Sequence, residues 1–228
     1  MKRYFLVLFF VLIIMLSGCG KDKVIIALNN SIAEKRISLS KGECQGVKAT
    51  LMSGYREQDY VINGNATNLI EFLVLTFYVD GFEAYDFLEA SYILNIGIER
   101  FTGNLELNPY DNSLVADIGK MYNITENVMA KLMLNGKTYK IYFKSVSALW
   151  NIDADAAINI YCNSFRKELE HFVTYDKLNG EVYVKILQED KIEGYYWYIT
   201  MVTPSGKSIS AVIDIDSGNV ITNSVNIS

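Results

Sequence analysis

The stretch that decides the fold runs from Val128 to Lys144 and reads VMAKLMLNGKTYKIYFK. Its centre, Asn135-Gly136, tolerates positive φ at both central positions of a type I′ turn, so it predicts a tight β-hairpin. The second arm alternates between two faces: Tyr139, Ile141 and Phe143 share one, and Thr138, Lys140, Tyr142 and Lys144 share the other. This period of two predicts one buried face and one wet face.

Strand and turn signals continue upstream of this hairpin, from about Glu43 to Ser147. Leu69 to Val79 is an apolar run with the length of a buried strand, and Tyr92 to Ile98 alternates. About seven short strands in such a segment are typical of a β-sandwich of immunoglobulin-like size. The Cys–Trp–Cys spacing of antibody domains is absent, so the sequence predicts only the architecture.

The periodicity changes after Leu149 to Ile152, which predicts a domain boundary. Asp153 is a suitable helix cap, and Asp155 lies in the first turn, where a negative charge is favourable. Apolar residues then recur at helical spacing, and they are Ala157, Ile160, Tyr161, Phe165, Leu169 and Phe172. Three strands are predicted after the helix, at Glu181–Leu187, Tyr195–Thr203 and Ser208–Ile215. One helix on an antiparallel three-stranded sheet is an α+β unit.

This C-terminal part resembles the PepSY domain family. The similar segments are Ile152–Ile158 for the helix opening, Gly194–Val202 for the central strand and Gly206–Val220 for the closing hairpin. Ile213 and Ser217 depart mildly from the family pattern. The resemblance implies a cell-envelope module; members are often proposed to restrain peptidases, and others are envelope binding domains.

The N-terminus has the pattern of a signal peptide. Lys2 and Arg3 precede an apolar run from Phe5 to Leu16, which is shorter than the about 20 residues that a membrane-spanning helix needs. The run ends in Leu16-Ser17-Gly18-Cys19, which resembles the bacterial lipoprotein box. The resemblance implies cleavage between Gly18 and Cys19 and lipidation of Cys19. The alternative is an ordinary signal peptide with a chance cysteine.

These signals predict four segments. They are a signal peptide over residues 1–18, a tether over 19–42, a β-sandwich domain over 43–149 and a PepSY-like α+β domain over 150–228. The tether is inferred from a polar segment of mixed charge, although Val24 to Leu28 is suitable for a short strand. The predicted fold class is therefore mixed: an immunoglobulin-like β-sandwich, followed by one helix on a three-stranded antiparallel sheet.

Charge and cysteine content exclude several functions. Losing Lys2 and Arg3 with the signal takes the formal net charge from −5 to −7, which is unfavourable for nucleic acid. Cys44 and Cys162 remain after lipidation, either as a disulfide or as two separate thiols. With His171 as the single histidine and no Cys-x-x-Cys motif, we predict no metal site and no cofactor.

Tyr195-Tyr196-Trp197-Tyr198 is the densest aromatic patch and the candidate binding surface. Alternation places Tyr195 and Trp197 on one face and Tyr196 and Tyr198 on the other. One pair is expected to pack under the helix, and the other to form a platform for a peptide or glycan. The alternative is that all four only line the core and the strand.

Acidic residues offer weaker candidates. One interpretation of Asp214 and Asp216 is a cation site that they form with Glu193. The interpretation that we favour is an ordinary turn. Asp80, Asp86 and Glu89 belong to an acidic aromatic loop that also contains Glu83. His171 is not accompanied by a Gly-x-Ser-x-Gly motif, so we favour a structural role for it over a catalytic one.

The sequence therefore predicts a lipid-anchored envelope protein that faces the extracytoplasmic side of the cell membrane or outer membrane. We do not expect it to be an enzyme. We expect it to bind a peptide, a protease or another envelope protein, with strand addition at the edge of the small sheet as one mode. The alternatives are an envelope hydrolase using Asp80, Asp86 and Glu89, and a purely structural or assembly lipoprotein. The oligomeric state stays open.

Overall fold

The computed structural model describes residues 22–58, 62–83, 89–124, 128–188 and 194–227. The predicted signal peptide, with Gly18 and Cys19, lies outside these residues. The helices are α2 (Lys23–Asn29), α3 (Ala154–Ser164), α4 (Arg166–Glu170) and the 3₁₀ turn η2 (Ser147–Leu149). The strands are β1 (Ile32–Cys44), β2 (Val47–Glu57), β3 (Leu69–Val79), β4 (Ala90–Ile96), β5 (Glu99–Asn104), β6 (Glu106–Leu107), β7 (Leu114–Asp117), β8 (Val128–Leu134), β9 (Lys137–Ser145), β10 (Val173–Thr174), β11 (Lys177–Leu178), β12 (Glu181–Gln188), β13 (Tyr195–Val202), β14 (Ser208–Asp214) and β15 (Val220–Asn226).

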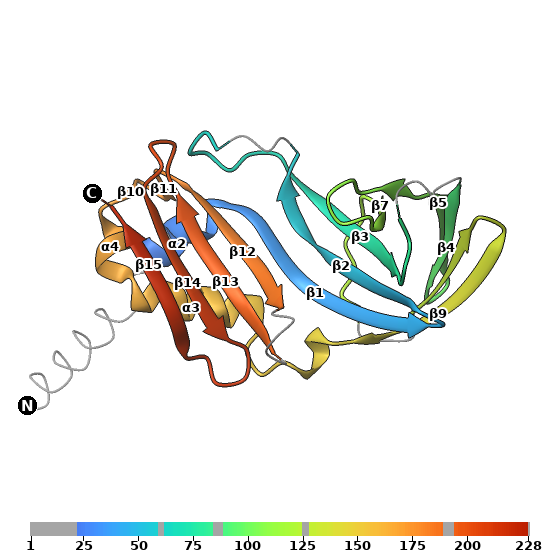
Figure 1. The fold of residues 1–228 in the computed structure, drawn as a ribbon. Helices are drawn as coiled ribbons and strands as arrows, with labels where there is room; N and C mark the ends of the chain where they lie inside the picture. Colours follow the sequence, from blue (N-terminus) through green and yellow to red (C-terminus); the bar gives the residue numbers. More distant parts are fainter. Residues whose placement is uncertain (1–21, 59–61, 84–88, 125–127, 189–193, 228) are drawn as a thin grey trace, which may run out of the picture.

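One continuous sheet organises the whole described chain. Its strand order is β15-β14-β13-β12-β1-β2-β3-β7-β6, and β9, β8, β4 and β5 branch from β1 in that order. In Figure 1, β1 and β2 sweep from the β12–β15 half to the half that contains β4, β5 and β9. The pair β1–β12 is parallel, and the other pairs of this sheet are antiparallel.

Strand β1 joins the two halves. Its outer edge pairs first with β12, at Ile32–Lys35, and then with β9, at Ser40 and Lys41. Its other edge pairs with β2 along nearly its whole length. Because one strand belongs to both halves, neither half has a complete sheet without it.

In one half of the sheet the helices cover one face, and in the other half the layer of β4, β8 and β9 covers the opposite face. One core cluster lies between the helices and β12–β14, and a second lies between β2–β3 and β4, β8 and β9. Leu51 and Met52 are neighbours in β2 but pack against different clusters. Since successive strand residues face opposite sides, the helices and the β4–β8–β9 layer must cover opposite faces of the sheet.

The predicted fold class is wrong. The structure is mostly β, and its main sheet runs without a break through both predicted domains. The expected three-stranded C-terminal sheet is extended by β15 on one side and by β1 on the other. The strand pairs that produce this continuity join residues far apart in the sequence, so local periodicity carried no sign of them.

The tether assignment fails for residues 23–42, because they form α2 and most of β1. Several of the charges that indicated a solvated linker are paired within the fold. The buried Glu34 carboxylate lies 2.7 Å from Nε of Arg36 and 3.2 Å from Nζ of Lys185, and Lys35 Nζ lies 2.7 Å from Asp155.

Several local predictions agree with the structure, whereas Val24 to Leu28 lies in α2 and forms no strand, and the helix predicted through Phe172 is divided into α3 and α4. Asn135 and Gly136 both have positive φ, and the β8–β9 register pairs Val128 with Phe143. The Asp153 side chain caps α3 by accepting a hydrogen bond from the Ala156 N–H. The three C-terminal strands lie within a residue of their predicted bounds.

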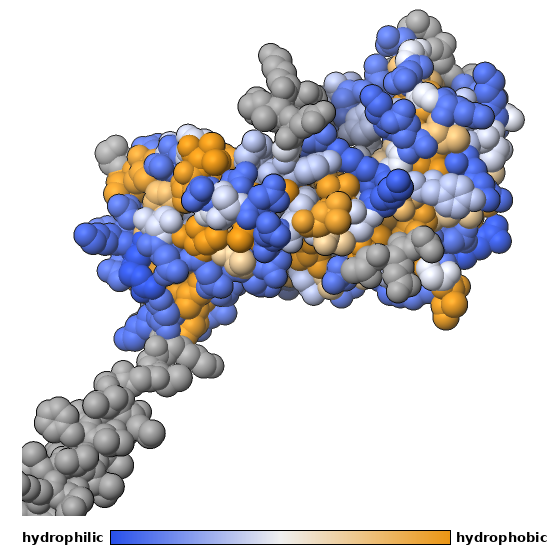
Figure 2. All heavy atoms as spheres, turned by 90° about the horizontal axis from the view of Figure 1, so that it is seen from below, coloured by the Kyte–Doolittle hydropathy of each residue, from blue (hydrophilic) through white to orange (hydrophobic). Residues whose placement is uncertain are grey.

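Exposed apolar side chains are scattered over the surface. Figure 2, seen from below, shows hydrophobic residues in separate patches divided by hydrophilic ones. Single exposed apolar residues of this kind are normal on a protein surface. Within the described residues, no helix combines the length and the apolar composition that crossing a bilayer requires.

Candidate functional site

The candidate site is a hollow of about 960 Å³ on the outer sheet face, here called the lysine groove. It is lined by Lys41, Gly42, Glu43, Lys48, Ala49, Thr50, Tyr78, Asp80, Tyr142, Lys144 and Gln188. These residues come from β1, β2, β9, the end of β3 with the following turn, and the end of β12. The groove therefore lies where the two halves of the sheet meet.

The strand register sets the order of the groove's side chains. Lys48 of β2 lies opposite Glu43 of β1 and opposite Tyr78 of β3. In the next row, Lys41 lies opposite both Thr50 and Lys144. These rows face outward because the alternate β2 residues, Val47, Ala49 and Leu51, are buried in the core between the two layers.

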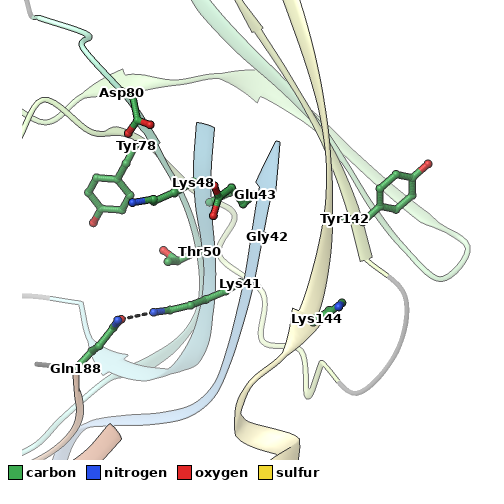
Figure 3. A pocket seen from close by; sticks show the side chains of 11 residues that line it. Lys41, Gly42, Glu43, Lys48, Thr50, Tyr78, Asp80, Tyr142, Lys144 and Gln188 are labelled. Carbon is green, nitrogen blue, oxygen red and sulfur yellow. Dashed lines mark hydrogen bonds between the residues drawn. The ribbon is translucent and has the colours of Figure 1, made fainter. Parts of the chain in front are cut away.

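Figure 3 shows how the groove's side chains are directed. Lys48 extends toward Tyr78, and Lys41 extends toward Gln188, on one side of β1; Tyr142 and Lys144 project on the other side. The Lys41 ammonium donates a hydrogen bond to Oε1 of Gln188. The groove thus has two rims, each with a tyrosine and at least one lysine.

The backbones of the paired strands β1 and β9 approach each other closely at Gly42. A Cβ atom at this position would lie 2.6 Å from Cγ2 of Ile141 and 2.6 Å from the Tyr142 carbonyl oxygen. Only glycine permits this approach. The absence of a side chain at Gly42 therefore keeps Tyr142 and Lys144 next to β1.

The groove carries an excess of positive charge on an acidic chain. Its three lysines, Lys41, Lys48 and Lys144, face two carboxylates, Glu43 and Asp80. Lys48 and Lys144 are exposed, and within the described ranges no ion pair engages either of them. Their charge is therefore available to an anionic ligand.

The aromatic patch Tyr195–Tyr198 is divided between two faces, as the alternation predicts. Trp197 is buried and donates its indole N–H to the Ile152 carbonyl at 2.8 Å. Tyr196 and Tyr198 are half-buried on the opposite face, where the Tyr198 hydroxyl lies 3.4 Å from that of Ser210. The four residues therefore do not form one binding surface.

Tyr195 connects this patch to the lysine groove. The Lys41 ammonium lies 5.0 Å from the centre of the Tyr195 ring, within the range of a cation–π contact. Tyr195 also packs near Trp150, with ring centres 5.7 Å apart. Of the four predicted surface residues, Tyr195 is the one that borders the groove.

The acidic residues of the hydrolase alternative are not brought together where they are described. Asp80 lines the lysine groove, whereas Glu89 lines a separate hollow beside Asn135 and Gly136. Asp86 lies outside the described residues. Glu83 is exposed and lies within hydrogen-bonding range of Asn112.

Asp214 belongs to a turn, as favoured from the sequence. Its Oδ1 atom accepts hydrogen bonds from the backbone N–H groups of Asp216 and Ser217 and from the Ser217 hydroxyl. These hydrogen bonds to Ser217 and Asp216 lower the pKa of the Asp214 carboxyl. Glu193, the third member of the cation-site alternative, lies outside the described residues. No group of three or more potential metal ligands is found in the part of the chain that the structure describes.

The remaining candidates have structural surroundings. Cys44 is half-buried and Cys162 is buried, and both are free thiols, so the disulfide alternative is wrong. Burial raises the pKa of the Cys162 thiol. His171 is the C-cap of α4, where its backbone N–H donates to the Leu169 carbonyl.

Sequence reasoning missed the lysine groove because Lys41 was assigned to the tether. The hairpin pattern did place Tyr142 and Lys144 on a wet face, but it gave no partner for that face. The alternation of Lys48 and Thr50 with buried β2 residues was the remaining signal.

No protein-family model, no curated protein and no solved structure matches this chain.

Proposed function

We propose that this chain is a lipid-anchored protein of the cell envelope that binds an acidic segment of a peptide or partner protein and catalyses no reaction. The anchor rests on the resemblance of Leu16–Cys19 to the lipoprotein box, which implies a location on the extracytoplasmic side of a membrane. The binding role rests on the lysine groove. The partner class follows from the PepSY resemblance, which makes an envelope peptidase one candidate.

The excess of lysine in the groove carries this proposal. Lys48 and Lys144 are exposed cations on a chain with a net charge of −5. An acidic ligand gains from these charges, whereas a basic ligand does not. Tyr78 and Tyr142 have 41% and 62% of their surface exposed. Tyrosines add apolar contact area and a hydroxyl at such an interface.

The separation of Asp80 from Glu89 favours binding over hydrolysis. A hydrolase needs an acid and a base placed toward one reacting atom. Asp80 and Glu89 line separate hollows, so they cannot share such an atom. A lysine-lined groove instead supports reversible binding of moderate strength, which salt weakens because the charges are exposed.

A peptide titration tests the proposal. Fluorescently labelled hexaglutamate is the probe, and its anisotropy is measured with the full chain in a neutral detergent. Replacing both Lys48 and Lys144 with Gln is expected to weaken binding by about tenfold, since each exposed charge pair is worth about 0.2–1 kcal/mol.

Lys167 provides the matched control, because it is an exposed lysine on α4, away from the groove. Lys167→Gln should leave the affinity unchanged. Equal affinity of the original chain and the Lys48→Gln/Lys144→Gln variant would show that the groove does not bind acidic peptides.

A further inference from the structure

Strand β15 is an open edge of the main sheet. It is the last strand in the order, and it pairs with β14 alone. Figure 1 shows it at the outer margin of the molecule, with its free side turned away from the other strands. Six of its seven residues are exposed. The backbone groups on its outer side are therefore accessible to another strand.

This edge lacks charge and proline, two of the features that prevent strand pairing, although its register with β14 shifts by a β-bulge between Val220 and Thr222. Exposed edges usually carry charges or proline, or are very short. Strand β5 begins with Glu99-Arg100, and β6 has two residues and is followed closely by Pro109. Strand β15 reads VITNSVN, with neither a charge nor a proline. It also exposes 58% of Ile221 and 42% of Val225.

The sequence of β15 matches itself in an antiparallel register centred on Asn223. In that register Ile221 of one copy lies opposite Val225 of the other, and Thr222 lies opposite Ser224. Asn223 meets its own counterpart at the two-fold axis. Apolar residues therefore meet apolar residues, hydroxyls meet hydroxyls, and no like charges are brought together.

The faces of the sheet agree with this register. Val225 pairs with Ile209 of β14 and Asn223 pairs with Ala211, and both β14 residues face the core under the helices. Thr222 pairs with Val212 and Val220 pairs with Ile213, so Ile221 is the extra residue of a β-bulge, and the ladder is regular from Thr222 to Asn226. Pairing would place the Val225 side chain of each copy beside that core and opposite the bulged end of the other copy's β15, which holds Ile221.

We propose that two copies of this chain pair through β15 in antiparallel orientation, so that one sheet continues across the dimer. The occupant of the edge is a second copy because the strand is complementary to itself, as a two-fold interface requires. This inference is independent of the proposed binding function, since no residue of β15 lines the lysine groove. The dimer would carry two grooves and bind repeated acidic segments with avidity.

Cysteine crosslinking tests the pairing in the full chain in bacterial membranes. Residues facing each other in an antiparallel pair have Cα atoms about 4.5–5.5 Å apart, which is within the span of a disulfide. Asn223→Cys should therefore give a reducible dimer on mild oxidation. Thr102→Cys, exposed on the charged edge strand β5, is the matched control and should give no more dimer than the original chain.

Charge variants test the register. Added to Asn223→Cys, the pair Ile221→Lys/Val225→Lys places like charges opposite each other and should lower the crosslinked fraction by about tenfold. The pair Ile221→Lys/Val225→Glu places opposite charges there and should retain it. A dimer yield from Asn223→Cys no higher than from Thr102→Cys, or equal yields from the two charge variants, would overturn the proposal. Circular dichroism melting of each variant confirms that a lost crosslink is not a lost fold.

Discussion

At the scale of single residues, buried carboxylates hold distant segments together. Glu181 is fully buried, and its Oε1 atom accepts hydrogen bonds from the backbone N–H groups of Asn63 at 2.6 Å and Gly64 at 2.9 Å. Its other oxygen accepts from the Tyr183 hydroxyl at 2.7 Å. Glu181 thereby fastens the connection between β2 and β3 to the start of β12.

We expect Glu181→Ala to destabilise the protein by about 1.5–3 kcal/mol for each strong hydrogen bond that is not replaced, because hydrogen bonds to a charged group are lost and buried N–H groups are left without acceptors. The free energy of unfolding, measured by urea denaturation, checks this. Glu106→Ala is the control, since Glu106 is exposed, and it should change stability by less than about 0.5 kcal/mol. A change as small for Glu181→Ala would contradict the proposed role of Glu181.

At the scale of elements, the β8–β9 hairpin shows how pattern determines register. Ile141 is 0% exposed and Phe143 5% exposed, and both lie in the core between the two layers. Lys140 and Tyr142 are exposed. A slip of one residue would exchange these two sets, so burial of the aromatic and aliphatic face holds the register.

Phe143→Ala is expected to destabilise the protein by about 3–5 kcal/mol, because it removes a buried ring and leaves a cavity. Lys140→Ala should change stability by less than about 0.5 kcal/mol, since the side chain is exposed. Denaturant unfolding of the two variants gives both values. Equal midpoints would show that the hairpin has a different register in solution.

At the scale of the whole molecule, β1 makes the two halves depend on each other. The core under the helices includes Val24, Ala27 and Leu28 of α2 and Leu39 of β1. Together with Ile32, these residues precede the other buried members of that core by more than a hundred positions. A C-terminal fragment alone would expose the surfaces that α2 and β1 cover, and β12 would lose its parallel partner.

The predicted domain boundary implies that residues 150–228 fold independently, whereas in the structure this half shares its core with α2 and its sheet with β1. We expect a fragment of residues 150–228 to unfold without a cooperative transition, since it lacks α2 and β1. Thermal unfolding followed by circular dichroism measures this. Adding a synthetic peptide of residues 22–44 should restore a cooperative transition. Cooperative melting of the fragment alone would show that β1 is dispensable for this half.

The sequence by itself determined the local features of this protein. Asn135-Gly136 specified the hairpin turn, Asp153 specified the start of α3, and alternation specified the buried face of β9. Each of these depends on residues a few positions apart, whose interactions the chain geometry already dictates. The lipoprotein box is likewise a local signal, and its role stays a prediction.

Only the tertiary structure decided which strands meet. The pairing of β1 with β12 joins Lys35 to Val184, and its pairing with β9 joins Lys41 to Lys144. No local pattern distinguishes these partners from others, because any strand offers the same backbone donors and acceptors. The polar composition of β1 indicated a tether, since its ion pairs with Asp155 and Lys185 form only in the folded chain. The lysine groove could not be predicted for the same reason: its residues come from strands that only this pairing brings together.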